Sequence, residues 1–292
     1  MTLAPSGEKL VIVKPKKLGT KLLAVVCIVV LLFIANAFRT GDIGWSVVGE
    51  YLFSRPVMHG VLGTIVMTFC SMVLGILLGV TAAMMRMSEN RVLQSISSGY
   101  VWLFRGTPAL LQLLLWFNLA LIFPTISFFG FYSVSTVDVM TPFIAALLGL
   151  GIQQGAYTAE VVRAGLLSVD KGQTEAALSI GMTRLRAMIG IVLPQAMRVI
   201  VPPIGNETIG MVKLTSLASV IQYAEVLRSV EDVYYANSRV IELLIVAAIW
   251  YMVIVTVLSI AQVYIERYFS RGWGRRNQSA QPAAAPQIVE EA

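Results

Sequence analysis

Polar side chains recur at helical spacing inside two otherwise apolar stretches of the sequence. In the first stretch, Gln153, Tyr157 and Glu160 follow one another at steps of four and three residues, with Gln154 beside them. Residues at these steps share one face of an α-helix. In the second stretch, one glutamate precedes a short run that is mostly polar: Glu207, then Lys213, Leu214, Thr215 and Ser216. Such side chains can hydrogen-bond or pair with a polar solute.

The composition places both stretches in a lipid bilayer. Hydrophobic residues make up 57% of the 292 residues, charged residues only 13%, and the mean hydropathy is +0.77. These values exclude a soluble globular protein, a disordered chain and a disulfide scaffold. A charge at the centre of a bilayer costs about 2.5–3.5 kcal/mol or more, so the polar faces must point into a helix bundle. We expect Gln153, Gln154 and Tyr157 to line a solute path.

Two alternatives remain open for the other polar residues. Glu160 with Arg163 is expected to form a structural ion pair near one membrane surface. Glu207 and the run Lys213–Ser216 either line the same path or hydrogen-bond one helix to another. Pro202, Pro203 and Gly205 interrupt the start of that helix, as in transport helices that expose backbone groups to a cavity.

The residue pattern argues against catalysis by this chain. It lacks a phosphate-binding loop, a nucleophile elbow and a zinc-protease histidine pair. Cys27 and Cys70 match no metal or redox spacing and are predicted to be buried small hydrophobes. The single histidine, His59, is expected in an exposed loop. We therefore predict no metal and no cofactor, and any uphill transport must draw on an ion gradient or a partner protein.

Six segments are apolar and long enough to suggest membrane spans of about 20 residues. The third is short and is expected to extend back toward Val101, and the first stands apart from the others. Residues 1–20 and 277–292 have the composition of tails. The predicted spans are Leu22–Phe38 (within an added helix, 21–38), Val61–Met85, Pro108–Phe123, Phe143–Val162, Val199–Ile221 and Ile241–Ile265.

The basic residues orient these spans. With the N-terminus in the cytoplasm, 17 of the 22 lysines and arginines lie on the cytoplasmic side, four lie outside and Lys213 lies within a span. The positive-inside rule therefore favours a cytoplasmic N-terminus over the reverse. A cleavable signal peptide is the alternative for the first span, because Ala35-Asn36-Ala37 resembles a cleavage site. Cleavage would leave the other five spans in the same orientation.

The longest predicted cytoplasmic segment, about 163–198, contains two short helical blocks. Gln173–Ile180 is followed by Thr183–Val192, and Gly181 between them is well placed as a left-handed residue that ends the first helix. Thr183 can cap the second helix. Two short helices at an angle would form a projection that a soluble partner can bind.

This segment resembles the EAA loop of bacterial ABC importer permeases. Glu175-Ala176-Ala177, then Gly181, then Ile191-Val192-Leu193-Pro194 match that pattern without a gap. In that family the loop forms coupling helices that dock onto an ATPase subunit. Glu175, Ala176, Ala177 and Gly181 are therefore the predicted ATPase-coupling residues, and ATP would be bound by the partner rather than by this chain.

Further matches favour the permeases of polar-amino-acid importers. They are Phe104-Arg105-Gly106-Thr107-Pro108, Gly155–Glu160 with Arg163, Leu193-Pro194-Gln195-Ala196, Pro202–Glu207, and Lys213 with Thr215-Ser216-Leu217. The resemblance implies an all-α inner-membrane protein with a five-helix core of the type I importer class, about 60–271, and makes the first helix an addition. On residue grounds, Thr107 and Pro108 would start a span at the cytoplasmic surface, with Arg105 at the lipid headgroups. Gly75 and Gly79 would let helices pack closely.

The resemblance also implies partners and leaves rival functions. Expected partners are two ATPase subunits, an extracytoplasmic amino-acid-binding protein, a second permease subunit (identical or a sister chain) and membrane lipid, without nucleic acid. A permease for an opine or small peptide, or an ion-driven transporter, is the alternative. Leu214 stands where many relatives that import basic amino acids carry an aspartate. Its lack of charge predicts a neutral or acidic amino acid as substrate.

Overall fold

The structure, a computed structural model, describes residues 18–128 and 132–270. It divides into two units, Met1–Val47 and Val48–Ala292, which are taken separately here. The first contains α1 (Leu18–Thr40) and the start of α2 (Trp45–Tyr51). Most of the predicted tail 1–20 and all of the tail 277–292 lie outside the described residues. The predicted added helix is confirmed as a helix, and it begins at Leu18.

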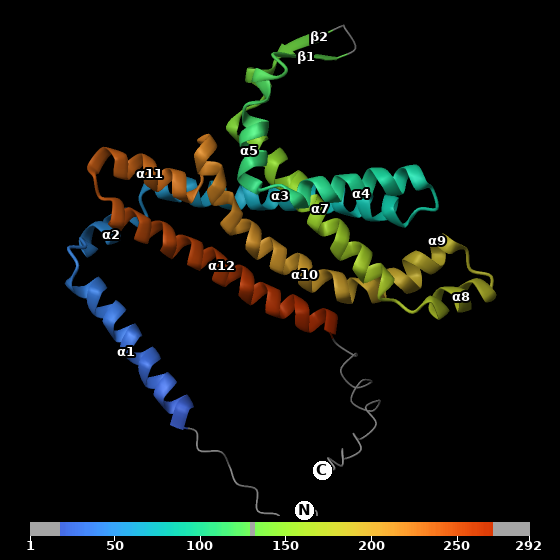
Figure 1. Cartoon of the computed structure of the whole chain (residues 1–292), viewed down its shortest axis with the longest axis horizontal. Coiled ribbons are helices and arrows are strands. Elements are labelled where there is room, and N and C mark those ends of the chain that lie inside the picture. The colour runs from blue at the N-terminus through green and yellow to red at the C-terminus, as the bar shows by residue number, and fades with distance from the viewer. Residues whose placement is uncertain (1–17, 129–131, 271–292) are drawn as a thin grey trace, which may run out of the picture. The chain divides into compact units, whose positions relative to one another are not determined.

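The second unit is built on two long helices, α3 (Arg55–Met87) and α7 (Pro142–Leu167), which pack along each other (Figure 1). A Cβ added at Gly75 would lie 2.6 Å from the Gln154 side chain, and one at Gly79 would lie 2.5 Å from that of Thr158. Neither contact leaves room for a methyl group. The prediction that these glycines permit close helix packing is confirmed, and the packing is within the chain.

The third predicted span is two helices rather than one. α4 (Arg91–Gly106) ends at Thr107, and α5 (Ala109–Phe117) begins after Pro108. A helix begins directly after Pro108, as predicted, but the predicted extension of this span toward Val101 is interrupted at Thr107 and Pro108. The Thr107 hydroxyl donates backward to the Leu103 carbonyl instead of capping α5. Proline disfavours helical geometry in the residue before it, which explains the break.

Beyond α5, a short 3₁₀ turn (Leu119–Leu121) leads to a two-stranded antiparallel hairpin. The strands are β1 (Thr125–Phe128) and β2 (Tyr132–Ser135), with Thr125 opposite Ser135. The short helix α6 (Thr136–Val139) follows. The predicted all-α fold class is confirmed, and this hairpin is a local exception where serine, threonine and β-branched residues favour strands.

The predicted coupling segment contains the two expected short helices, α8 (Lys171–Ser179) and α9 (Arg184–Ala187). Gly181 between them has φ +85°, so the left-handed turn is confirmed. Thr183 accepts a hydrogen bond from the Arg186 backbone N–H, which confirms the cap. A π-helical turn (Met188–Val192) then joins α9 to α10.

The chain returns through α10 (Leu193–Leu214) and a 3₁₀ turn (Thr215–Ile221), then α11 (Val226–Asn237) and α12 (Val240–Ser270). α10 therefore begins six residues before the predicted Val199 and includes both prolines. Among the described residues, four helical stretches are long and apolar enough to cross a membrane: Leu22–Thr40, Arg55–Met87, Arg184–Ile221 and Val240–Phe269. α7 is 26 residues long but carries the polar face discussed below.

Three small predictions need correction. Cys27 is exposed on α1, and Cys70 on α3 is half-buried, so neither is a buried residue of the bundle. Each still lies within an apolar helix and has no disulfide partner. His59 is exposed as expected but sits in the first turns of α3 rather than in a loop, because Pro56 and the preceding Ser54 already start the helix there.

Candidate transport path and coupling surface

Glu207 on α10 is joined to α7 by two hydrogen bonds. Its Oε2 accepts from Gln154 Nε2 at 2.6 Å and from Thr158 Oγ1 at 3.3 Å. Gln154 and Thr158 are both buried, at the place where glycines let α3 approach α7. The structure thus brings Gln154 and Glu207 together, although no pattern in the sequence indicates which of these residues meet. Among the described residues, no hydrogen bond to Glu207 Oε1 is found.

Gln153 and Tyr157 lie on a neighbouring strip of α7. Gln153 Nε2 lies 3.5 Å from the Thr107 carbonyl oxygen, at the break between α4 and α5. The Tyr157 ring is partly exposed, and the guanidinium carbon of Arg105 lies 5.0 Å from its centroid. A cation at this distance from an aromatic face is attracted to it. Arg105, which is exposed, is therefore positioned by Tyr157 of α7.

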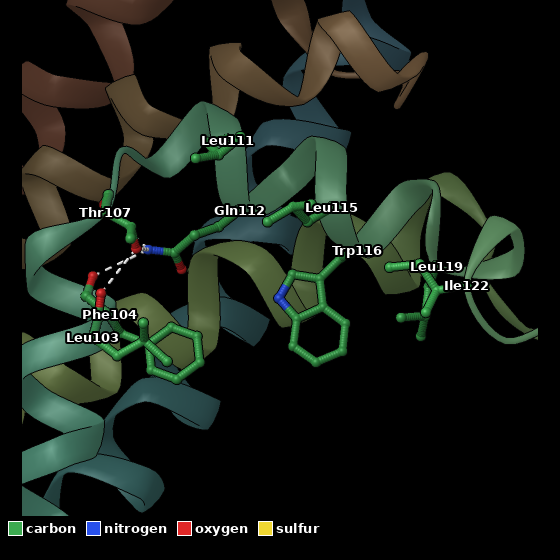
Figure 2. A pocket seen from close by; sticks show the side chains of 9 residues that line it. All are labelled: Leu103, Phe104, Thr107, Leu111, Gln112, Leu115, Trp116, Leu119 and Ile122. Atoms are coloured by element: carbon green, nitrogen blue, oxygen red, sulfur yellow. Dashed lines mark hydrogen bonds between the residues drawn. The ribbon is translucent and has the colours of Figure 1, made fainter.

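The break between α4 and α5 is held by one amide. Gln112 Nε2 donates to the carbonyls of Phe104 and Thr107 and to the Thr107 hydroxyl, at 2.8–3.2 Å (Figure 2). Figure 2 also shows the Trp116 and Phe104 rings beside Gln112 in a pocket of about 300 Å³. The pocket lining is almost wholly apolar, so it suits an apolar side chain or lipid better than a polar solute.

The predicted polar run on α10 is less exposed than the sequence suggests. The Thr215 hydroxyl donates to the Val212 carbonyl, and the Ser216 hydroxyl donates to the Lys213 carbonyl. Thr215 is buried, whereas Lys213 and Leu214 are exposed. No ion pair joins Lys213 to Glu207 in the described part of the chain, as their spacing predicts.

Pro202 and Pro203 lie inside α10 without ending it, and α12 packs against them. Gln262 of α12, which is buried, donates from Nε2 to the Pro202 carbonyl at 3.0 Å and to Glu266 at 2.8 Å. A Cβ at Gly205 would lie 1.7 Å from Gln262 Oε1. A helix packed this closely leaves no room for solute at that point.

The far end of α7 carries a three-residue ion cluster. Arg163 donates to Glu160 Oε2 through Nε at 3.2 Å and Nη2 at 2.8 Å, which confirms the predicted pair. Arg86 of α3 donates to Glu160 Oε1, a contact that the sequence did not indicate. Only its position at the end of the preceding span could have suggested it. The cluster ties the ends of α3 and α7 together.

The predicted coupling residues lie on α8 and in the turn that follows it. Glu175 and Ala176 are exposed, whereas Ala177 is buried against the chain. Ile180 and Leu185, at either side of the Gly181 turn, are 79% and 68% exposed. Exposed apolar residues beside charged ones are typical of a protein interface. Arg184 of α9 also lies 3.6 Å from Glu89, in the turn between α3 and α4.

A second carboxylate cluster, which the sequence pattern did not predict, surrounds Glu225. Glu225 is fully buried and accepts from the backbone N–H groups of Leu227 and Arg228 at 2.9 and 2.7 Å, and from the Tyr251 hydroxyl. It caps α11. Its burial raises the pKa of its carboxyl, although these hydrogen bonds act in the opposite direction. A glutamate at a helix start was the available signal.

Comparison with known proteins decides the family. Residues 75–271 match the model for the inner-membrane component of binding-protein-dependent transport systems. The arginine transport system permease protein ArgU of Corynebacterium glutamicum is 39% identical over 93% of this chain and 87% of its own length. The chain belongs to this permease family. The L-cystine permease TcyB of Bacillus subtilis is 38% identical over 78% of this permease and 92% of the relative.

Solved structures agree on the fold. A crystal structure of an amino acid ABC transporter with histidines superposes with a TM-score of 0.64 at 34% identity, covering 73% of this permease and 94% of that chain. A chain of the MetNI methionine ABC transporter in an inward-facing conformation is 19% identical with a TM-score of 0.59, covering 75% of this permease and 100% of that chain, which supports the fold alone. The family consists of transport components, so this permease is not itself the ATP-hydrolysing subunit.

Proposed function

We propose that this permease is the membrane-spanning subunit of an ATP-driven importer of polar amino acids. The observation that carries the proposal is the α8–α9 projection, where Gly181 turns in the left-handed region and Ile180 and Leu185 are exposed, in a chain of this family. Glu175 offers a carboxylate there for contacts with a partner. ATP is bound by two partner ATPases, and their closure is transmitted to the spans through α8 and α9.

The permease works as half of a dimer, with itself or with a sister chain, and receives its solute from an extracytoplasmic amino-acid-binding protein. It lies in the inner membrane with a cytoplasmic N-terminus, an orientation supported by the distribution of lysine and arginine. The permease core spans about 60–271, and α1 is an added helix.

Gln153, Gln154, Tyr157 and Glu207 line the solute path in this proposal, and the run Lys213–Ser216 borders it. Support comes from the Gln154–Glu207 contact and the partial exposure of Tyr157. Leu214 favours a neutral or acidic amino acid. Relatives named for arginine, L-cystine, glutamine and nopaline, an opine, keep other substrates open. An uptake panel of these solutes in proteoliposomes distinguishes them.

Coupling is tested at Gly181, where only the backbone conformation is at issue because a Cβ there meets nothing within 4 Å. Gly181→Val should insert normally but reduce uptake by about tenfold or more, since β-branched residues resist φ > 0. Gly181→Asn should keep most activity, because asparagine tolerates that region. ATP hydrolysis by the Val variant should stop responding to the loaded binding protein. Equal uptake by both variants at equal abundance would contradict the coupling role.

Orientation is tested by cysteine labelling in a variant without Cys27 and Cys70. Ser46, Ser133 and Ser179 are exposed, and each is replaced in turn by cysteine. An impermeant thiol reagent should label positions 46 and 133 in sealed cells, and position 179 only after the membrane is opened. Labelling of position 179 from outside would reverse the proposed topology.

A further inference from the structure

Three arginines and one glutamate surround two adjoining cavities along the seam of α3, α4 and α7. One cavity, of about 470 Å³, is lined by Arg86, Arg105, Tyr157 and Glu160, together with Ser98 and Trp102 of α4. The other, of about 380 Å³, shares Arg86 and Ser98 and adds Gln94 and Arg163. Side chains of both cavities thus continue the polar face of α7.

The charges in this seam do not balance. Glu160 forms ion pairs with Arg86 and Arg163, so its single negative charge is already shared by two positive charges. Arg105 has no ion pair or hydrogen bond among the described residues, and its contact is the uncharged ring of Tyr157. Three positive charges face one negative charge, which leaves a surplus of two. A surplus of this sign beside an open cavity attracts an anionic group.

Arg105 also lies close enough to act electrostatically on Glu160 and on Glu207. Glu207 keeps one oxygen without a hydrogen bond in the described part of the chain. The region therefore offers a cationic and an anionic group in the same part of the bundle. A free amino acid is a zwitterion that carries one group of each sign, and a guanidinium binds a carboxylate through two parallel hydrogen bonds.

We propose that Arg105, held over the Tyr157 ring, binds the α-carboxylate of the transported amino acid on its way through the permease. This inference rests on the proposed function and adds to it a residue that the sequence placed at the membrane surface. Tyr157 positions the guanidinium, and the Arg86–Glu160–Arg163 cluster keeps the cavity electropositive. A lipid phosphate is the competing anion, because Trp102 at the cavity rim is 77% exposed.

The test uses the full complex with its ATPase and second permease subunit in nanodiscs, without the binding protein. Binding of radiolabelled L-glutamine, L-glutamate, L-arginine and L-cystine is measured up to about 10 mM, each in competition with the amino-acid amide that lacks the carboxylate. Arg105→Gln should weaken binding by about tenfold or more, the usual size of a lost charged hydrogen bond. Arg105→Lys should recover part of the loss. Arg91→Gln, on the same helix but outside both cavities, is the matched control.

A second readout separates carboxylate binding from a structural role. The wild type should prefer the amino acid over its amide, Arg105→Gln should lose that preference, and Arg91→Gln should keep both the preference and the ATP hydrolysis measured without solute. Unchanged affinity and preference in Arg105→Gln would overturn the inference. So would an affinity loss that appears only in nanodiscs containing phosphatidylglycerol, since the cavity would then hold lipid. If the wild type binds the amino acids but Arg105→Gln and Arg91→Gln have the same affinity and the same preference for the amino acid over its amide, the inference alone fails. If the wild type binds none of them and proteoliposomes import none, both the inference and the proposed substrate class fail.

Discussion

Glu225 and Glu160 are both partly or wholly withdrawn from solvent, but the permease holds them in different ways. Glu225 is fully buried and accepts hydrogen bonds from two backbone N–H groups and one tyrosine hydroxyl, all neutral donors. Glu160 is about one-fifth exposed and is held by two arginines beside open cavities. The Glu225 site is closed to solvent, and neutral donors make its hydrogen bonds. The second is open and carries surplus positive charge.

The surroundings sharpen this difference. Around Glu225, Gly63 lets the backbone of α3 approach Ala224, the Val226 N–H donates to Thr64, and the Tyr223 hydroxyl donates to the Gly63 carbonyl. Close backbone contacts of this kind allow only one packing arrangement, so they hold α3 and the segment before α11 in a fixed relative position. Around Glu160, long arginine side chains can exchange partners without moving a helix. The comparison suggests that the Glu225 cluster anchors the bundle and the Glu160 cluster leaves room for solute and motion.

The largest effect is expected at the anchor. Gly63→Ala would place a methyl group 2.0 Å from the Ala224 carbonyl oxygen, a contact that only a backbone shift can relieve. We expect loss of most folded protein, measured by fluorescence-detected size exclusion. Gly99→Ala on α4 is the control, because a Cβ there meets nothing within 4 Å. A yield of folded Gly63→Ala equal to that of the wild type would show that the backbone around Glu225 can shift to accept a methyl group.

A smaller effect distinguishes the two carboxylates directly. Glu160→Gln removes the partner of two arginines that remain about one-third exposed, and should cost about 1–2 kcal/mol after allowance for solvent. That corresponds to about 3–6 °C in the midpoint of thermal unfolding. Glu225→Gln should cost less near neutral pH, because its donors are neutral and the raised pKa shows that burial disfavours the charge.

The pH dependence of that midpoint provides the internal check. A carboxyl whose pKa is raised by folding stabilises the protein fully below its unfolded pKa, and this contribution is lost as pH rises through the folded pKa. The wild-type midpoint should therefore fall relative to that of Glu225→Gln as the pH rises above about 4.3, the ordinary pKa of glutamate in an unfolded chain. Parallel curves for the two proteins would remove the distinction between the sites.

Local features of the permease were predictable because short-range chemistry decides them. Gly181 had to take a left-handed turn between two helical blocks, and Thr183 had to cap the second. Gly75 and Gly79 share a face that only a close neighbour explains. The Glu160–Arg163 pair follows from helical spacing. Each conclusion uses residues within one or two turns of each other.

The other features of the site depend on which helices pack against each other. The residue pattern of a single sequence does not indicate these pairs. Arg86 reaches Glu160 across 74 positions, Gln154 reaches Glu207 across 53, and Gln262 reaches Pro202 across 60. The break at Pro108 was misjudged for a different reason. A threonine–proline pair suits the start of a helix and the joint between two helices equally well, and only the length of α4 decides between them.

That joint gives the α4–α5 segment a mechanical property that a continuous helix lacks. The Thr107 carbonyl accepts from Gln112 on α5 and lies 3.5 Å from Gln153 Nε2 on α7, so one oxygen atom is shared by both helices. Pro108 has no N–H to lose when the angle between α4 and α5 changes. α4 and α5 are each stiff, so the chain bends most easily at the Thr107–Pro108 joint. The position of α7 sets the angle between the two helices. A displacement of α7 would therefore reach α5 as a rotation rather than as a shift along its axis.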